Sequence, residues 1–212
     1  MKACFKVLVV LWVLFFAAHL YAAAVVSPPQ QTVMNVSAEL RQALKNNEAA
    51  IQANPKPELF RIVKQVVLPY VDLDQMITVV LGRAGHAEWL QASKEMQNEF
   101  IDQFIILVVG TYSAALQQYD NQPLQVFPVR GFKPDDTRAE VHSVLVRDNG
   151  QEIQLLYNLQ KEGKEWKTTD FSVEGISLIQ SYQEQFQSII QSDGLAGLIN
   201  ALKKHNQSNN ND

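Results

Sequence analysis

The residue types that usually carry catalysis are sparse in this sequence. Its only cysteine is Cys4, and Ser177 in Gly175-Ile176-Ser177-Leu178 lacks the second glycine of a nucleophile elbow. The histidines beyond the N-terminal region stand singly, without the paired spacing of a helical zinc motif: they are His86, His142 and His205. We therefore expect neither a metal centre nor a Ser or Cys nucleophile, and we interpret each histidine as structural or exposed.

One pair of side chains could perform acid–base chemistry. Asp170 and Glu174 lie four residues apart around Phe171, with Gly175 next. This arrangement is more typical of a turn at the end of a strand than of a catalytic pair. A small hydrolase or isomerase would need a polar pair inside a cavity, and Asp170 with Tyr157 is the candidate. That enzyme is a third hypothesis, and our main expectation is a protein that is not an enzyme.

The charge of the chain argues against nucleic acid as a partner. The 18 basic residues are outnumbered by 22 acidic ones, which gives a net charge of −4, and no basic stripe is present. Binding to phosphate backbones depends on clustered Lys and Arg. Glycine-rich phosphate loops are also absent. Charged residues make up 19% of the chain, below the roughly 25% of an average globular protein, and glutamine and asparagine take their place.

The first 24 residues have the pattern of a secretory signal peptide. Lys2 and Lys6 precede an apolar run over residues 7–18, and residues 22–24 are all alanine. The run is shorter than the roughly 20 residues that span a membrane. Cleavage after about Ala24 would remove two of the 18 basic residues and no acid, which leaves a net charge of −6, and would also remove Cys4. We therefore expect an exported protein that folds around an apolar core without a disulfide.

Helical periodicity covers both ends of the remaining chain. Apolar residues at three- and four-residue spacings predict helices over 31–46, 58–68, 75–81, 94–119, 176–190 and 195–204. Gly82 is the expected C-cap of the third helix. The helix over 94–119 is apolar on all sides between Ile105 and Val109, which predicts a central position. The polar tail, residues 206–212, should be disordered, so residues 25–205 form one domain.

Four segments between these helices have strand character. They cover residues 124–129, 138–148, 153–160 and 165–173, and turn signals at 148–150 and 161–164 predict hairpins, hence an antiparallel sheet. The third strand alternates, with Ile153, Leu155, Tyr157 and Leu159 on one side. The fold class is therefore α+β, with helices packed on a four-stranded antiparallel sheet. The apolar surplus fits either a well-filled core or a lipid cavity, and the residues alone favour the core.

Two sets of residues are similar in order and spacing to the toluene-tolerance family, over most of residues 35 to 203. The helical half carries Leu68-Pro69-Tyr70-Val71-Asp72, Val80-Leu81-Gly82, Trp89, Ala92-Ser93, Phe100, Phe104, Tyr112, Leu116 and Tyr119. The C-terminal half carries Trp166, Asp170, Val173-Glu174-Gly175-Ile176-Ser177-Leu178, Tyr182, Gln185-Phe186, Ile189-Ile190, Gly194-Leu195, Gly197-Leu198 and Leu202. No single piece is diagnostic, but their succession is specific.

The resemblance implies a phospholipid carrier of the periplasm that helps to maintain outer-membrane lipid asymmetry. Such a carrier exchanges glycerophospholipid between an outer-membrane lipoprotein–porin complex and an inner-membrane ABC transporter with an MCE-domain ring. The family fold has helices on a curved antiparallel sheet and holds the lipid tails in an apolar cavity between them. The resemblance implies no cofactor besides this lipid cargo. We also expect a monomer.

The energetics of lipid burial agree with this expectation. About 30 methylenes at roughly 0.8 kcal/mol each amount to about 25 kcal/mol, above the practical ceiling of about 18 to 21 kcal/mol for affinity in water. The relevant competitor is therefore the bilayer. A carrier needs a cavity about as apolar as a membrane interior, and few polar anchors.

Combining the pattern with the resemblance places the pocket between the central helix, the inner faces of strands two to four and the first C-terminal helix. The predicted tail contacts are Leu81, Phe104, Val108, Tyr112, Leu145, Leu155, Tyr157, Phe171, Ile176 and Ile179. The second hypothesis is a non-lipid periplasmic adaptor that docks two membrane complexes. The same fold with a filled interior would serve that role.

Overall fold

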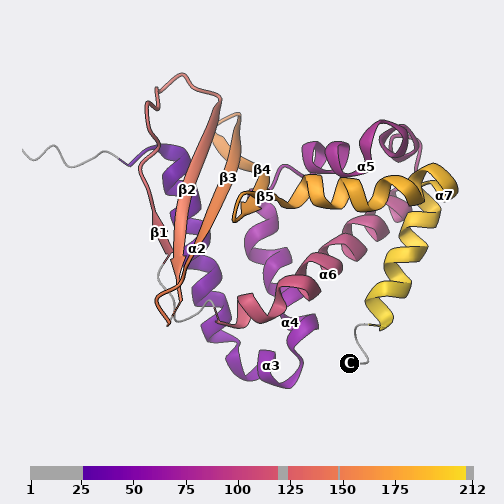
Figure 1. The fold of residues 1–212 in the computed structure, drawn as a ribbon, viewed down its shortest axis with the longest axis horizontal. Helices are drawn as coiled ribbons and strands as arrows, with labels where there is room; N and C mark the ends of the chain where they lie inside the picture. The colour runs from indigo at the N-terminus through magenta and orange to yellow at the C-terminus, as the bar shows by residue number, and fades with distance from the viewer. Residues whose placement is uncertain (1–25, 119–123, 148, 209–212) are drawn as a thin grey trace, which may run out of the picture.

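The computed structural model describes residues 26–118, 124–147 and 149–208. Helices form most of the molecule, and a sheet stands at one side of it (Figure 1). The helices are α2 (Pro28–Asn46), α3 (Glu48–Ala53), α4 (Pro55–Ile62), η1 (Val63–Val67), η2 (Leu68–Tyr70), α5 (Leu73–Trp89), α6 (Lys94–Gln118) and α7 (Leu178–Ser208). The strands are β1 (Leu124–Val126), β2 (Arg138–Val146), β3 (Glu152–Glu162), β4 (Glu165–Val173) and β5 (Ile176–Ser177). The predicted signal peptide lies outside the described residues.

The predicted second helix, over 58–68, is wrong in its type and bounds. An α-helix begins at Pro55, because proline suits the first turn of a helix, and it ends at Ile62. The next five residues, Val63–Val67, form a π-helix, and Leu68–Tyr70 form a 3₁₀ turn. π-Helical turns are rare and occur often at functional sites. Sequence periodicity also missed the short helix α3.

Helices α5 and α7 are each divided by a glycine that the sequence marks as a helix boundary. Gly82 in α5 has φ 61° and ψ −173°, and Gly194 in α7 has φ 66° and ψ −169°. This conformation is almost exclusive to glycine. Each of α5 and α7 is therefore two helices joined at a sharp kink, and the predicted helix end at Gly82 is confirmed. The Glu88 carboxylate accepts a hydrogen bond of 2.7 Å from the Leu195 N–H, at the start of the second part of α7.

The sheet is an antiparallel meander in the order β1-β2-β3-β4-β5. The expected four strands are joined by a fifth, β5, which has only two residues and pairs with the end of β4. Strand β1 ends at Val126, short of the predicted residue 129. Val141 pairs with Tyr157, which pairs with Phe171, and Ser143 pairs with Leu155. Their side chains therefore share one face of the sheet, which we call the inner face; it includes Leu145 and packs against α2 through Val33.

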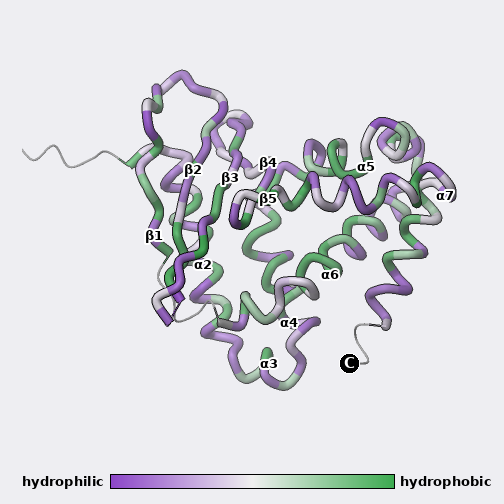
Figure 2. Tube along the Cα trace, in the orientation of Figure 1, coloured by the Kyte–Doolittle hydropathy of each residue, from purple (hydrophilic) through white to green (hydrophobic). Residues whose placement is uncertain are grey.

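Three apolar clusters hold the fold together. Helices α5, α6 and α7 build the first, around Phe100 and Leu198. Helices α2, α3, α4 and α6 build the second, around Leu59 and Ile62. The third joins α2 to the inner face of the sheet. Because α6 contributes to both helical clusters, its predicted central position is confirmed; Figure 2 shows it hydrophobic along most of its length.

The C-terminal tail begins later than predicted. Helix α7 extends to Ser208, and the Asn206 side chain is 7% exposed. Its amide donates hydrogen bonds of 2.9 Å to the carbonyl and the side-chain oxygen of Gln103 on α6. Periodicity could not reveal this, because the anchoring residue is polar. Residues 209–212 lie outside the described residues.

Candidate functional site

The inner face of the sheet collects four of the predicted lining residues. Leu145, Leu155, Tyr157 and Phe171 all point to this face by the strand register. The Tyr157 and Phe171 rings are 5.0 Å apart between centroids. Leu145 is buried, whereas the other three side chains are only half-buried. Large apolar side chains that stay half-buried are candidates for the wall of a binding site.

The helices contribute the next group. Phe104 and Val108 lie on α6, half-buried against the first cluster, and Leu81 and Ile179 are buried members of that cluster. The Phe104 ring contacts the Tyr182 ring edge-on at 5.1 Å. Leu81 and Ile179 therefore have the environment of core residues, and Phe104 lies between the core and the partly exposed side of α6.

The last two predicted residues differ from the rest in exposure. Tyr112 is half-buried on α6, one residue after Thr111, whose hydroxyl accepts a long hydrogen bond of 3.4 Å from Tyr182. Ile176 is 67% exposed on the edge strand β5, although it pairs with Val173 of the inner face. Ile176 thus places an exposed apolar side chain at the edge of the inner face.

Sequence reasoning identified the apolar residues of the π-helix as helix positions but did not assign them to the site. Val63, Val66 and Val67 are half-buried, and none of the five residues of η1 is buried. Val63 and Val66 pack against the second helical cluster, and η2, which follows, is tied to the sheet because the Lys167 ammonium donates to the Pro69 carbonyl at 2.6 Å. The segment therefore connects the helices to the sheet. A helical pattern before Leu68-Pro69 predicts a helix end, but not a π-helix.

A buried hydroxyl interrupts the inner face. Ser143 is 2% exposed, between Val141 and Leu145 on β2, and its hydroxyl has no hydrogen-bond partner among the described residues. Buried polar groups are normally paired, and an unpaired one costs stability. The alternation of β2 indicates that Ser143 faces inward, but the sequence gives no sign that it lacks a partner.

Asp170 and Tyr157 do not form a catalytic pair. Asp170 pairs with Asn158, the neighbour of Tyr157, so the two side chains point to opposite faces of the sheet. The Asp170 carboxylate accepts hydrogen bonds from the N–H groups of Phe171, at 2.8 Å, and Ile179, at 3.4 Å. It therefore positions the start of α7. This removes the pair that the enzyme hypothesis required.

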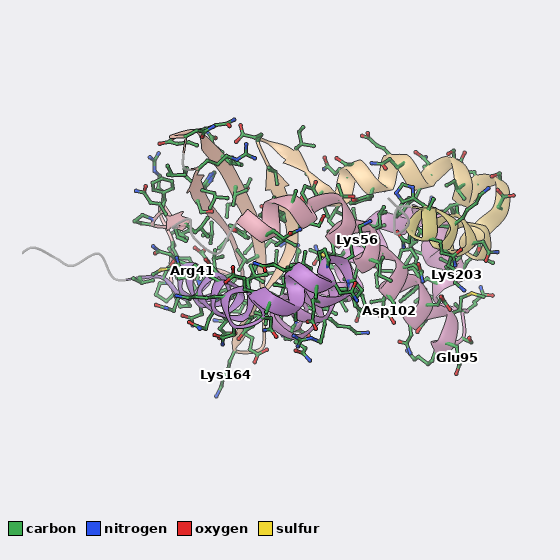
Figure 3. The ribbon with its side chains drawn as sticks, turned by 90° about the horizontal axis from the view of Figure 1, so that it is seen from below. Arg41, Lys56, Glu95, Asp102, Lys164 and Lys203 are labelled. Atoms are coloured by element: carbon green, nitrogen blue, oxygen red, sulfur yellow. The ribbon has the colours of Figure 1, made fainter. Side chains whose placement is uncertain are left out.

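Charged side chains lie on the outside of the described part of the chain. Lys164 extends away from the hairpin between β3 and β4 (Figure 3). Asp102 of α6 forms a 2.7 Å ion pair with Lys64, and Lys203 of α7 forms one of 3.0 Å with Glu99. No group of three or more His, Cys, Asp or Glu that could hold a metal exists among the described residues.

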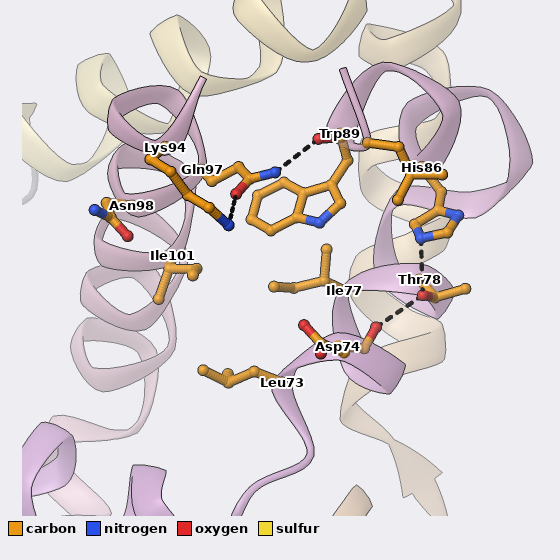
Figure 4. A pocket seen from close by; sticks show the side chains of 11 residues that line it. Leu73, Asp74, Ile77, Thr78, His86, Trp89, Lys94, Gln97, Asn98 and Ile101 are labelled. Carbon is orange, nitrogen blue, oxygen red and sulfur yellow. Dashed lines mark hydrogen bonds between the residues drawn. The ribbon is translucent and has the colours of Figure 1, made fainter. Parts of the chain in front are cut away.

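A pocket of about 560 Å³ opens between α5 and α6. Figure 4 shows its walls, with the α5 residues facing the first turns of α6. The lining residues are Leu73, Asp74, Ile77, Thr78, His86, Trp89, Leu90, Lys94, Gln97, Asn98 and Ile101. None of them belongs to the predicted lipid contacts. We call this cavity the α5–α6 pocket.

Comparison with known proteins identifies the family. The family model "MlaC protein" matches residues 34–204. The chain belongs to the MlaC family. Toluene tolerance protein Ttg2D of Pseudomonas putida is 28% identical over 170 residues, which cover 78% of this chain and 74% of that protein. The intermembrane phospholipid transport system binding protein MlaC of Haemophilus influenzae is 25% identical over 179 residues, which cover 83% of this chain and 81% of that protein.

A solved structure extends the MlaC likeness to the whole fold. A phospholipid-binding protein from Ralstonia solanacearum, determined in complex with a phospholipid, matches with a TM-score of 0.75 and 28% identity. The match covers 86% of this chain and 99% of that one. The predicted family and the α+β fold class are therefore confirmed.

Helix α6 of this MlaC-family chain is unusually apolar for its low burial. Residues 94–117 are long and apolar enough to cross a membrane by length and composition. In the most apolar 18-residue stretch of this helix, only 17% is buried inside the molecule. An ordinary core helix buries its apolar face. Here much of the apolar surface of α6 is left partly accessible.

Proposed function

We propose that this protein is a periplasmic phospholipid carrier that holds the acyl chains between the inner face of the sheet, α6 and the first turns of α7. The observation that carries the proposal is the match, over 99% of its length, to a phospholipid-binding protein solved with its lipid. Because the identity is 28%, the shared fold is supported by shared sequence. The proposed contacts are the predicted residues other than Leu81 and Ile179, which are buried in the first cluster.

The burial pattern supports this placement. Leu155, Tyr157 and Phe171 on the sheet and Val108 and Tyr112 on α6 are large or apolar, yet none is buried. In a well-filled core such side chains would be excluded from solvent. A lipid chain seated against them would remove their remaining apolar surface from water.

The composition of this wall fits the energetics of a carrier. Each methylene buried is worth about 0.8 kcal/mol against water, but nothing against another hydrocarbon environment. A lining of aliphatic and aromatic side chains therefore makes transfer from a bilayer nearly balanced in free energy. Exchange in both directions then becomes feasible without an energy source in this protein.

The partners follow from the same role. The carrier would receive and deliver glycerophospholipid at an outer-membrane lipoprotein–porin complex and an inner-membrane ABC transporter with an MCE-domain ring. The resemblance of the sequence to the toluene-tolerance family and the name of the Haemophilus influenzae relative support this route. The shuttle would maintain outer-membrane lipid asymmetry.

A lipid extraction tests the proposal. The chain from Val25 onward, exported and purified without detergent, is extracted with organic solvent and analysed by mass spectrometry. We expect about one phospholipid per protein from wild type. Leu155→Trp fills the inner face and should lose most of the lipid. The matched control is Leu156→Trp, on the opposite face of the same strand, which should keep it.

Absence of phospholipid from folded wild-type protein would overturn the carrier function and favour the docking adaptor. Equal lipid content in Leu155→Trp and wild type would instead show that the lipid lies elsewhere. Circular dichroism of each variant separates loss of cargo from loss of fold.

A further inference from the structure

The α5–α6 pocket is a cavity that the proposed carrier function does not use. Its floor is apolar: Ile77 and Trp89 are buried and Ile101 is half-buried. Leu90, 70% exposed, stands at its lip. A cavity of about 560 Å³ with such a floor lies within the size range of small-molecule sites.

The side of the pocket formed by α6 is fixed by hydrogen bonds. The Gln97 amide donates to the Trp89 carbonyl at 2.9 Å, and its oxygen accepts a 2.9 Å bond from the Lys94 ammonium. These bonds hold Lys94 beside the indole (Figure 4). The ammonium keeps two further N–H donors. Lys94 is therefore a positioned cation at an apolar surface.

The side formed by α5 carries the opposite charge. The Asp74 carboxylate faces the pocket across Ile77 (Figure 4). Asp74 and Lys94 form no ion pair with each other in the described structure, in contrast to Lys64 and Asp102, which are 2.7 Å apart. The two charges therefore remain available on opposite walls of an apolar floor.

His86 is held in this wall through Thr78. The Thr78 hydroxyl lies 2.7 Å from the Asp74 carbonyl, to which it donates, and 3.1 Å from the His86 Nε2. The imidazole is thus held against α5, and its Nδ1 is not used by this pair.

We infer that the α5–α6 pocket binds a small zwitterion with an apolar part. Its anionic group would lie at Lys94, its cationic group at Asp74, and its apolar part on Trp89 and Ile77. Two sources share this chemistry: the headgroup of a zwitterionic phospholipid, and a free amino acid with an aliphatic or aromatic side chain. The site is separate from the proposed acyl-chain site, because none of its lining residues is among the proposed acyl-chain contacts.

Tryptophan fluorescence tests the inference. After removal of residues 1–24, Trp89 and Trp166 are the remaining tryptophans, so Trp166→Phe leaves Trp89 as the sole reporter. The probes are glycerophosphoethanolamine and L-leucine, each titrated to about 10 mM, with glycerol 3-phosphate and ethylamine as controls that carry charge of one sign only. None of these probes carries a lipid acyl chain, so the result does not depend on the carrier function.

Saturable binding of a zwitterion, and weaker binding of both controls that carry charge of one sign only, supports the inference. Binding of glycerophosphoethanolamine alone assigns the site to a headgroup, and binding of L-leucine alone assigns it to amino acids. Asp74→Asn and Lys94→Gln should each weaken binding about threefold to tenfold. Glu95→Gln, exposed on the same turn and not among the lining residues, should bind like the parent.

Thr78→Phe is a second, independent test, because it places a ring in the α5–α6 pocket from an exposed position. We expect it to abolish the fluorescence change while the helical content is preserved. The inference is overturned if neither zwitterion produces a saturable change. It is equally overturned if Thr78→Phe and the two charge variants bind as well as the parent.

Discussion

The first helical cluster and the part of the inner face formed by Leu155, Tyr157 and Phe171 contain the same kinds of residue but differ in burial. Phe100 in the cluster is 0% exposed and stacks on Phe104 at 5.9 Å, whereas Phe171 on the sheet remains half-buried. Tyr182 is buried and Tyr157 is not. Residue type alone therefore does not separate a core from a wall that could bind cargo. The residual exposure of these side chains is what supports the proposed site.

The first prediction sets Phe100→Ala against Phe171→Ala. Removing the fully buried ring leaves a cavity and should lower the free energy of unfolding by about 3–5 kcal/mol. Removing the half-buried ring should cost about 1–2 kcal/mol but deplete bound phospholipid. Urea unfolding of both variants, with lipid extraction, measures the two effects. Equal losses of unfolding free energy in the two variants would contradict the proposed difference between the two regions.

The second prediction concerns the bend of α7, which shapes the helical cluster. Gly194→Ala forces a side chain into a glycine conformation, and its Cβ would lie 2.8 Å from the Glu88 carboxylate. We expect a loss of about 2–3 kcal/mol, measured by thermal and urea unfolding. The control is Gly110→Ala in α6, where an added Cβ meets nothing within 4 Å. It should be neutral or stabilising by up to about 1 kcal/mol, and a similar loss in both variants would contradict this account of the bend.

The third prediction tests the inner face through Ser143. Replacing its unpaired hydroxyl by the methyl of Ser143→Ala removes a buried polar group without a partner. Stability should rise by about 1 kcal/mol. Ser172→Ala, at another buried serine of the sheet, is the comparison and should not stabilise. A destabilised Ser143→Ala would mean that its hydroxyl makes a hydrogen bond in solution.

The last prediction concerns how the free energy of unfolding changes at alkaline pH through Tyr182 of the first helical cluster, and its effect is small. Burial raises the pKa of the Tyr182 hydroxyl, opposed by its hydrogen bond to Thr111. The unfolded chain therefore loses this proton first as pH rises above about 10. Folding stability from this group is constant below that pH and declines above it. Tyr182→Phe should show a shallower decline between about pH 9 and 11, and an unchanged slope would contradict the assignment.

The sequence predicted the helical periods, the hairpins and the face of β3 well, because each rests on local spacing. Leu155, Tyr157 and Phe171 could be placed on one face from the alternation and the hairpin turns alone. The π-helix at Val63–Val67 and the anchoring of Asn206 could not be predicted. Both depend on contacts between segments distant in sequence.

The same limit applies to the sites. Periodicity marked Leu81 and Ile179 as apolar helix positions. It could not distinguish a core residue from a residue that lines a binding site, because that depends on whether protein or ligand packs against the side chain. The α5–α6 pocket was missed because its polar residues fall on two helices, and nothing in the spacing shows that Asp74 and Lys94 face each other. Both helices pack against α7, and this arrangement places the two residues on the walls of one pocket.

Site-specific photo-crosslinking on β3 in the exported protein tests most directly whether the acyl chains lie on the inner face of the sheet. A photoreactive amino acid replaces Tyr157 on the inner face or, as the matched position, Gln154 on the exposed opposite face. After illumination, mass spectrometry of the intact protein detects covalently attached lipid. We predict a phospholipid adduct from position 157 and none from position 154. Lipid that co-purifies but crosslinks equally at both positions, or only at 154, would contradict the placement of the acyl chains.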